Sequence, residues 1–361
     1  MRGAPAFAAR APRNRRRSCF CFVATALTLI RRVPIKYTQV HAHPFMAIAT
    51  TAATTAAPSP SSHGARPTFG GNLSERLRDA LPKIVMSPSI ALIAVFVYGF
   101  IGFTTYLSLT DSRILPSFDF VGLANYIKLF GLRNWGIALK NLAIFGALYI
   151  VICTVLGLAL AILLDQKIRG EGVLRPVYLY PMALSFIVTG TAWKWFLDPG
   201  LGLEHTMHLW GWTSFQFDWI KSRDFAIYTV VLAAVWQSSG FVMAMCLAGL
   251  RGINDEILKA AQIDGASNFN LYRRIIIPQL RATFLSVFVI LGHLSIKSYD
   301  LVIALTGGGP GRATEMPATF MYSYTFTRNQ MGVGASSAVI MLLTIVAIMV
   351  PYLYRELKQR S

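Results

Sequence analysis

The chain has 361 residues, of which 54% are hydrophobic and 14% charged, and its formal net charge is +18. Its mean hydropathy is positive, at +0.51. A composition of this kind excludes an ordinary soluble domain and a disordered chain, and it is typical of a membrane protein. The charge does not predict nucleic-acid binding, because no compact soluble domain gathers it on one face.

The first 45 residues form a basic arm that carries half of the net charge, with nine Lys or Arg and no acid. Three interpretations compete: a targeting peptide, a basic anchor at the membrane surface, or codons upstream of a start site placed too early. We favour the third, because Met46 opens a polar stretch rich in Ala, Thr, Ser and Pro. A signal-peptide core in the short apolar run 19–30 remains an alternative. Residues 46–81 are expected to form a disordered cytoplasmic leader.

Residues 82–358 are predicted to form one transmembrane domain. Five stretches lack any charged residue and can each supply the roughly 20 apolar residues of a spanning helix: 84–110, 141–164, 176–193, 225–250 and 329–354. A sixth, 283–305, is interrupted only by Lys297 and Asp300. The sequence therefore predicts an all-α integral membrane protein with six transmembrane helices.

The distribution of basic residues predicts the orientation of these helices. Placing the N-terminus inside makes four segments cytoplasmic, and together they hold fifteen Lys or Arg: 66–83, 167–175, 251–281 and 355–360. Fewer lie in the longer connections on the other side. Because basic residues beside membrane spans are retained on the cytoplasmic side, both termini and the segment 251–281 are expected to be cytoplasmic.

That segment contains a polar, Gly-punctuated stretch between two apolar runs, 256–278. Asn254 or Asp255 can cap a short helix there. Gly265 should end this helix, because glycine accepts a positive φ and lets another backbone come close. Ser267 can cap a second helix, which is expected to end before Pro278. The pattern predicts a helix, a hinge and a helix.

This stretch resembles the cytoplasmic EAA loop of permease subunits in binding-protein-dependent ABC importers. The matching positions are Ala260, Ala261, Asp264, Gly265, Ala266, Tyr272, Ile275 and Pro278. Lys259 stands where the motif has its glutamate, and Glu256 lies one turn earlier. The resemblance implies the type I permease architecture of ABC importers and assigns these ten residues to contact with an ATPase subunit.

A second resemblance lies after the fifth predicted span. The run Thr306, Gly307, Gly308, Gly309 and Pro310, followed by Thr314, is similar to the outer loop of sugar-importer permeases of the maltose and glycerol-phosphate branch. Three glycines and a proline cannot continue a helix, so a tight turn is expected. The resemblance implies that a soluble sugar-binding protein docks at this loop.

Polar residues inside the predicted spans are candidates for a substrate path, because ionisable groups there are costly. Lys297 and Asp300, three residues apart on one expected helix, can neutralise each other, and a structural ion pair is favoured over direct sugar contact. Gln237, Ser239 and His293 are further candidates. Each of these could instead bond to a neighbouring helix.

The two resemblances imply a permease subunit of an ATP-driven sugar importer in the bacterial inner membrane. This subunit is expected to be non-catalytic, because no phosphate-binding loop, nucleophile elbow or metal motif is present in the sequence. The resemblance implies a second permease, two ATPase subunits that use the ATP and magnesium, and a soluble binding protein as partners. General similarity of the spans favours a monosaccharide such as glucose or mannose. The alternatives are an importer permease for glycerol phosphate or amino acids, and an ion-coupled secondary transporter, which lacks support because no evident repeat relates the two halves.

Overall fold

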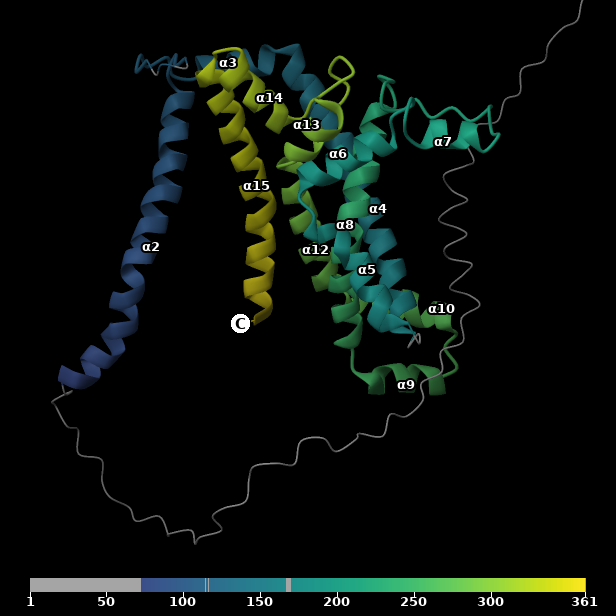
Figure 1. Ribbon diagram of the computed structural model, residues 1–361. Coiled ribbons are helices and arrows are strands. Elements are labelled where there is room, and N and C mark those ends of the chain that lie inside the picture. The colour runs from purple at the N-terminus through teal and green to yellow at the C-terminus, as the bar shows by residue number, and fades with distance from the viewer. Residues whose placement is uncertain (1–72, 114, 116, 167–169, 361) are drawn as a thin grey trace, which may run out of the picture. The chain divides into compact units, whose positions relative to one another are not determined.

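The computed structural model describes residues 73–113, 115, 117–166 and 170–360 (Figure 1). The predicted basic arm 1–45 and residues 46–72 of the predicted leader lie outside these residues. The described residues fall into two units, 73–103 and 104–360, and the second has the gaps just given. Apart from one isolated bridge between Thr110 and Phe120, the described residues contain only helices and their connections, as predicted from the sequence.

The first unit holds most of helix α2 (Leu73–Ser108). The helix begins within the stretch predicted to be a disordered leader, so residues 73–81 are helical. The charge-free stretch that follows continues the same helix.

The second unit is built around α4 (Arg133–Asp165) and α8 (Ala226–Arg251), which lie side by side (Figure 1). Every fourth residue of α4 is buried along one stripe: Phe145, Tyr149, Cys153, Gly157 and Ala161. Small residues in this stripe let the two helices approach closely. The hydroxyl of Tyr149 pairs with that of Ser238 on α8 at 2.7 Å. The remaining helices pack around this pair.

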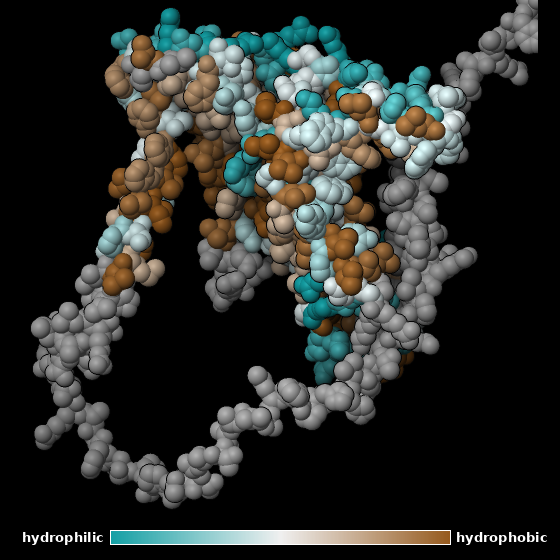
Figure 2. Space-filling view, in the orientation of Figure 1, coloured by the Kyte–Doolittle hydropathy of each residue, from teal (hydrophilic) through white to brown (hydrophobic). Residues whose placement is uncertain are grey.

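Apart from the segment between α8 and α12, the other elements of the second unit are short helices and one long helix. They are α3 (Ala124–Gly131), α5 (Glu171–Ala183), α6 (Phe186–Phe196), α7 (Leu203–Leu209), α12 (Arg281–Ile296), α13 (Asp300–Thr306), α14 (Pro317–Tyr322), the π-helix η2 (Ser323–Thr327) and α15 (Met331–Arg360). Figure 2 shows hydrophilic residues gathered over the connections at the upper edge, with hydrophobic residues along the helices below them. This banding is that of a protein crossing a lipid bilayer.

Four helical segments of the described chain are long and apolar enough to cross a membrane: Val85–Ser108, Arg133–Asp165, Ala226–Arg251 and Met331–Tyr354. Each coincides with a predicted span. Two further helix pairs pass the same test but are sharply bent, and they bring the number to six if each pair counts as one span. The structure therefore agrees with four of the predicted spans. One bent pair, 171–183 with 186–196, covers the predicted span 176–193, whereas the other, 269–279 with 281–296 and bent by 64°, overlaps the predicted span 283–305 only in part.

The predicted span 176–193 is broken between α5 and α6, which meet at an angle of 100°. Pro181 lies near the end of α5, where it removes a backbone donor, and Ser185 caps α6 by accepting a hydrogen bond from Val188 N at 3.3 Å. Because this cap lies four residues after the proline, α6 begins as a separate helix. The chain therefore turns at Leu184 and Ser185.

The predicted span 283–305 is also not one helix. Helix α12 ends at Ile296 and α13 begins at Asp300, with Lys297 to Tyr299 between them. An acid in the first turn of α13 stabilises that helix start through the helix dipole. The charged residues that interrupt the apolar run in the sequence thus mark a break in the helix.

Candidate coupling loop and transport cavity

The segment between α8 and α12 has the predicted helix, hinge and first turn of a second helix. Helix α9 (Asp255–Ile263) is capped by Asn254, whose side chain accepts a hydrogen bond from Glu256 N at 2.9 Å. Gly265 follows with a φ of +78°, in the left-handed region that favours glycine. The amide of Ala266 bonds back to Ala261 O at 3.0 Å and closes the helix end. Figure 1 shows α9 lying across the end of α8.

The second half of the segment differs from the prediction at its end. Helix α10 (Asn268–Leu271), the π-helix η1 (Tyr272–Ile276) and α11 (Ile277–Gln279) follow without a break, so the helix does not end before Pro278. In the wider π turn the amide of Ile277 bonds to Tyr272 O, five residues back. A wider turn leaves room for a proline ring and for its missing donor, so Pro278 is tolerated inside the helix.

The ten residues assigned to ATPase contact separate into two groups. Glu256, Lys259, Ala260, Asp264 and Gly265 are exposed on α9 and the hinge. Ala261 and Tyr272 are buried, and Ala266, Ile275 and Pro278 are half-buried. The hydroxyl of Tyr272 accepts a hydrogen bond from Gln166 Nε2 at 3.2 Å. The exposed group can contact a partner, whereas the buried group holds the loop against the helices.

Sequence reasoning missed the apolar residues on the exposed face of α9. Ile263, the last residue of this helix, is 86% exposed, and Ile257 is 43% exposed. The signal was present in the sequence, because an isoleucine among polar neighbours just before a hinge glycine has little to pack against. Exposed apolar residues on a polar helix are typical of a contact surface.

The outer loop forms the expected tight turn. Gly307 ends α13 with a φ of +63° and Gly308 continues at +86°. The hydroxyls of Thr306 and Thr314 pair at 2.7 Å, and the hydroxyl of Thr314 donates to Gly309 O at 3.0 Å. This buried threonine closes the loop over the glycines. The five residues Thr306, Gly307, Gly308, Gly309 and Pro310 therefore present mainly backbone to a partner.

The same loop is tied to α4 through Asn141, whose amide donates to Arg312 O at 3.2 Å and to Glu315 O at 3.0 Å. The side chain of Glu315 is only 12% exposed, and its Oε2 atom lies 3.6 Å from Nε of Arg312 with no hydrogen bond. Burial raises the pKa of the Glu315 carboxyl, and the positive charges of Arg312 and Arg328 offset part of that rise. The charged form of this acid is therefore less favourable in the folded loop than in water.

Glu315→Gln is expected to raise the thermal unfolding midpoint in detergent at pH 7 but not at pH 4. Because the folded-state pKa is raised, the native protein binds this proton more tightly than the unfolded chain does. Stability is therefore lost as the pH rises from the unfolded pKa through the folded pKa. Glutamine is neutral throughout and avoids that loss. A lower midpoint for the variant at pH 7 would mean that the pairing with Arg312 outweighs burial.

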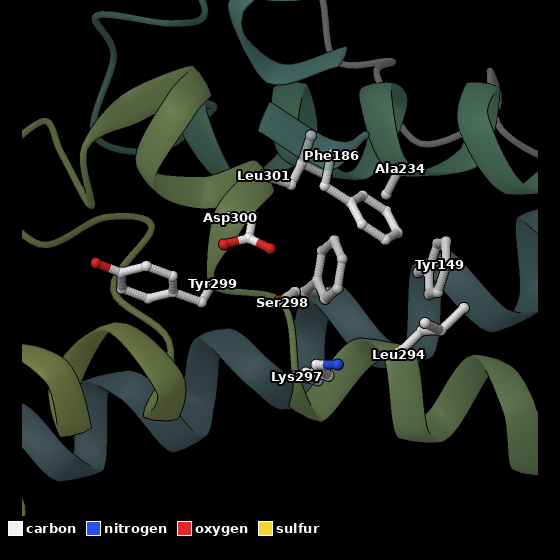
Figure 3. A pocket seen from close by; sticks show the side chains of 10 residues that line it. Tyr149, Phe186, Ala234, Leu294, Lys297, Ser298, Tyr299, Asp300 and Leu301 are labelled. Atoms are coloured by element: carbon white, nitrogen blue, oxygen red, sulfur yellow. The ribbon is translucent and has the colours of Figure 1, made fainter. Parts of the chain in front are cut away.

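A cavity of about 100 Å³ opens where α4, α6 and α8 meet the break between α12 and α13 (Figure 3). Its walls are formed by Phe145, Tyr149, Phe186, Ala234, Leu294, Lys297, Ser298, Tyr299, Asp300 and Leu301. Figure 3 shows Asp300 at the start of α13 and Lys297 at the end of α12, with the rings of Phe186 and Tyr149 farther in. Such a volume holds roughly seven water molecules, which is the scale of one small polar solute.

Two of the five predicted path residues, Lys297 and Asp300, line this cavity. The other three do not. Gln237 is buried and donates to Leu184 O at 2.8 Å, Ser239 is buried on α8 with its hydroxyl 3.4 Å from Trp236 O, and His293 is exposed on α12. Gln237 thus bonds to the neighbouring bend between α5 and α6, which was the alternative left open for it, whereas Ser239 bonds within its own helix.

The predicted ion pair between Lys297 and Asp300 is wrong. In the part of the chain that the structure describes, no ion pair joins Lys297 to Asp300. The break between α12 and α13 removes the helical spacing that would have brought the two side chains together. Both charged groups are therefore left to the cavity wall and not to each other.

The aromatic side of the cavity was missed by sequence reasoning. The rings of Phe145 and Tyr149 are stacked, with centroids 5.3 Å apart and an interplanar angle of 9°. Phe186 comes from α6, directly after the bend. A carboxylate and an ammonium group can bond hydroxyl groups, and ring faces can pack against C–H groups. This combination suits a small polyhydroxylated solute. No signal in the charge-free spans distinguishes these aromatics from ordinary packing residues.

Comparison with known proteins identifies the class to which this fold and site belong. Residues 154–360 match the family described as binding-protein-dependent transport system inner membrane component. The match spans more than half of the chain, so the chain belongs to this family. It is therefore a multi-pass inner membrane protein of a binding-protein-dependent transport system, and the ion-coupled secondary transporter is set aside.

Several curated proteins resemble the chain over most of its length. A probable ABC transporter permease of Pyrococcus horikoshii is 41% identical over 282 residues, covering 77% of this chain and 97% of its relative. A xylose/arabinose import permease of Haloferax volcanii is 35% identical, covering 74% and 85%. A trehalose/maltose permease of Thermococcus litoralis is 28% identical, covering 78% and 96%.

A crystal structure of a bacterial alginate ABC transporter, in complex with a periplasmic protein bound to an alginate pentasaccharide, contains a chain of the same fold. The TM-score is 0.67 at 17% identity, and the alignment covers 78% of this chain and 95% of that chain. The helical fold described above is thus that of an ABC transporter permease.

Proposed function

We propose that the chain is the permease subunit of an ATP-driven sugar importer, and that the exposed face of α9 with the Gly265 hinge docks a separate ATPase subunit. The main support is the structure of this segment: a short capped helix, exposed residues on one side, and a glycine with open space where its Cβ would lie. A partner backbone can come close only where no side chain intervenes. The buried residues of the loop keep it fixed to α4 and α8.

In this proposal ATP and magnesium are bound by the partner ATPase, and the permease supplies no catalytic group. Closure of two ATPase subunits would push on α9 and tilt the spans between inward-open and outward-open forms. A second, different permease would complete the path, and a soluble binding protein would deliver the solute at the Thr306–Pro310 turn. The exposed side chains of Lys297 and Asp300 support a shared path, because charged groups in a span face a cavity and not lipid.

For the substrate we propose a sugar, with a monosaccharide such as glucose or mannose as the first candidate. The support is the combination of aromatic rings with Lys297, Ser298 and Asp300 around one cavity. Pentose and disaccharide permeases are among the relatives. Glycerol phosphate is the second candidate, because Lys297 could bond a phosphate and a permease for sn-glycerol-3-phosphate from Agrobacterium fabrum is 29% identical.

Uptake of labelled solutes by a strain lacking this chain, with and without the restored gene, tests the proposal. The panel should include glucose, mannose, xylose, maltose, glycerol 3-phosphate and an amino acid. Restored uptake of a sugar that stops when ATP is depleted is the expected result. Restored uptake of glycerol 3-phosphate alone would replace sugar by the second candidate, and no restored uptake of any solute at full expression would contradict an import role for these compounds.

Asp300→Asn is expected to raise the KM for the transported sugar by tenfold or more, because a hydrogen bond to a charged group contributes about 1.5–3 kcal/mol. Association with the ATPase should not change, since Asp300 is remote from α9 along the chain. Asp224→Asn, an exposed acid in the connection before α8, is the matched control and should behave as the wild type. Equal KM values for all three proteins would remove Asp300 from the sugar path.

A further inference from the structure

Helix α5 depends on its neighbours to stay straight. It contains Pro176 and Pro181, and a proline inside a helix removes a backbone hydrogen bond and costs roughly 3 kcal/mol. The helix runs beside α8 (Figure 1), so contacts with α8 can replace what the prolines remove. Three such contacts are distributed from the first residue of α5 to the bend that follows it.

The first contact is an ion cluster at the end of α8 nearest α9. Arg251, the last residue of α8, donates from Nη2 to Glu171 Oε1 at 2.5 Å, and its Nε lies 3.8 Å from Asp165 Oδ1. Glu171 is the first residue of α5 and Asp165 is the last residue of α4. The planar guanidinium group can bond both carboxylates at once. One side chain thus ties the ends of three helices together.

The second and third contacts lie farther along the same pair of helices. At Gly240 of α8, an added Cβ would collide with the carbonyl group of Tyr178 and lie 3.3 Å from Leu179 Cα, so the two backbones touch. Gln237, one turn earlier, donates to Leu184 O at 2.8 Å, at the bend between α5 and α6. Because Gln237 is 3% exposed, this bond is shielded from water.

We infer that α5 and α8 move as one rigid pair during transport, and that Arg251 is the positioning residue that transfers the movement of α9 to the cavity. Three residues separate Arg251 from α9, so the ion cluster lies close to the start of α9. The far end of α5 leads through the bend into Phe186, which lines the cavity. Without the cluster, the start of α5 would no longer be fixed beside α9, and only the contacts at Gly240 and Gln237 would hold α5 to α8.

This inference rests on the proposed docking of an ATPase at α9, but it concerns a residue outside the docking face. Arg251 belongs to α8, and its partners belong to α4 and α5. The side chains of Arg251, Glu171 and Asp165 are 46%, 28% and 26% exposed. Partial exposure means that the cluster adds little to stability and that its loss should be tolerated by the fold. A change in coupling can therefore be separated from a loss of structure.

Arg251→Met in the complete transporter, reconstituted in liposomes with its ATPase and binding protein, tests the inference. The readout is the number of ATP molecules hydrolysed per sugar imported. The ATPase should co-purify as with the wild type and hydrolyse ATP within about twofold of its rate, while sugar uptake falls on the order of tenfold, so that the ratio rises by a similar factor. Arg251→Lys, which keeps the charge, should restore most of the uptake.

Spin labels at Val173 on α5 and Lys259 on α9, both exposed, give a second readout. The distance distribution between them should stay narrow through the ATP cycle in the wild type and broaden in Arg251→Met. Unchanged ATP-to-sugar ratios and distances would overturn the rigid-pair inference and leave ATPase docking intact. If the ATPase does not co-purify even with the wild type, it is the proposed docking that fails.

Discussion

Gly265→Asp is expected to leave the chain inserted in the membrane but to abolish its association with the ATPase, and uptake with it. No atom lies within 4 Å of the position of an added Cβ at Gly265, so the substitution meets no obstacle inside the chain. A φ of +78° strains any residue with a side chain, and Asp and Asn tolerate the left-handed region better than most others do. The expected loss therefore combines this strain at the hinge with a side chain that blocks the approach of the partner backbone.

Co-purification of the ATPase in detergent measures this effect, with all variants at matched expression. Gly265→Asn is the matched control, because it has the size of aspartate without its charge. Loss of the ATPase from both variants would mean that the hinge does not tolerate a side chain, and loss from the Asp variant alone would mean that charge is the obstacle. If both variants retain the ATPase and transport normally, α9 and its hinge are not the docking element.

Ile263 gives a test of the same surface that does not depend on the backbone at the hinge. It is 86% exposed on α9 and therefore contributes little to folding. Burial of an exposed isoleucine on docking contributes about 1.5–3 kcal/mol. Ile263→Ser is thus expected to weaken ATPase association by roughly tenfold or more, which a titration of the purified ATPase would measure.

Gly157→Leu is expected to destabilise the helix bundle by about 3 kcal/mol, the upper end of the usual cost of overpacking. An added Cβ at Gly157 would lie 2.6 Å from Val242 Cγ1 and 2.9 Å from the backbone nitrogen of Met243. Backbone of α8 cannot move aside as a side chain can, and a leucine is larger still. The variant should give a low yield of monodisperse protein and a lower thermal midpoint in detergent.

The matched control lies on the same helix. Gly136 is exposed near the start of α4, and nothing lies within 4 Å of the position of its Cβ. Gly136→Leu should therefore be neutral or slightly stabilising, because leucine favours helix more than glycine does. Equal yields and midpoints for the two variants would show that α4 and α8 can separate without loss, contrary to the tight packing of Gly157.

Much of the candidate site could be predicted because its signals are local. The cap at Asn254, the hinge at Gly265 and the turn at Thr306 depend on the conformational preferences of a few consecutive residues, and the structure contains all three. The continuation of the helix through Pro278 could not be predicted in this way. A π turn depends on how the segment packs against its neighbours, and Tyr272 is buried there.

The substrate path was harder to predict because polarity alone does not say where a side chain points. Gln237 and Ser239 were plausible path residues, yet each bonds to a backbone carbonyl away from the cavity. Lys297 and Asp300 reach the cavity only because the helix breaks between them. Phe145, Tyr149 and Phe186 had no distinguishing signal, since aromatic residues occur throughout charge-free spans.

By itself, the sequence determined that the chain is a helical membrane protein, where four of its spans lie, and that a helix-hinge-helix segment joins α8 to α12. These features follow from hydrophobicity and backbone preference, which act over a few residues at a time. The breaks in the other two predicted spans have local causes, at Pro181 and Ser185 and before Asp300, but hydrophobicity alone does not reveal them. Only the tertiary structure decided which polar residues line a cavity and that Arg251 ties α8 to α4 and α5. Those properties depend on contacts between residues far apart in the chain, and no local pattern encodes them.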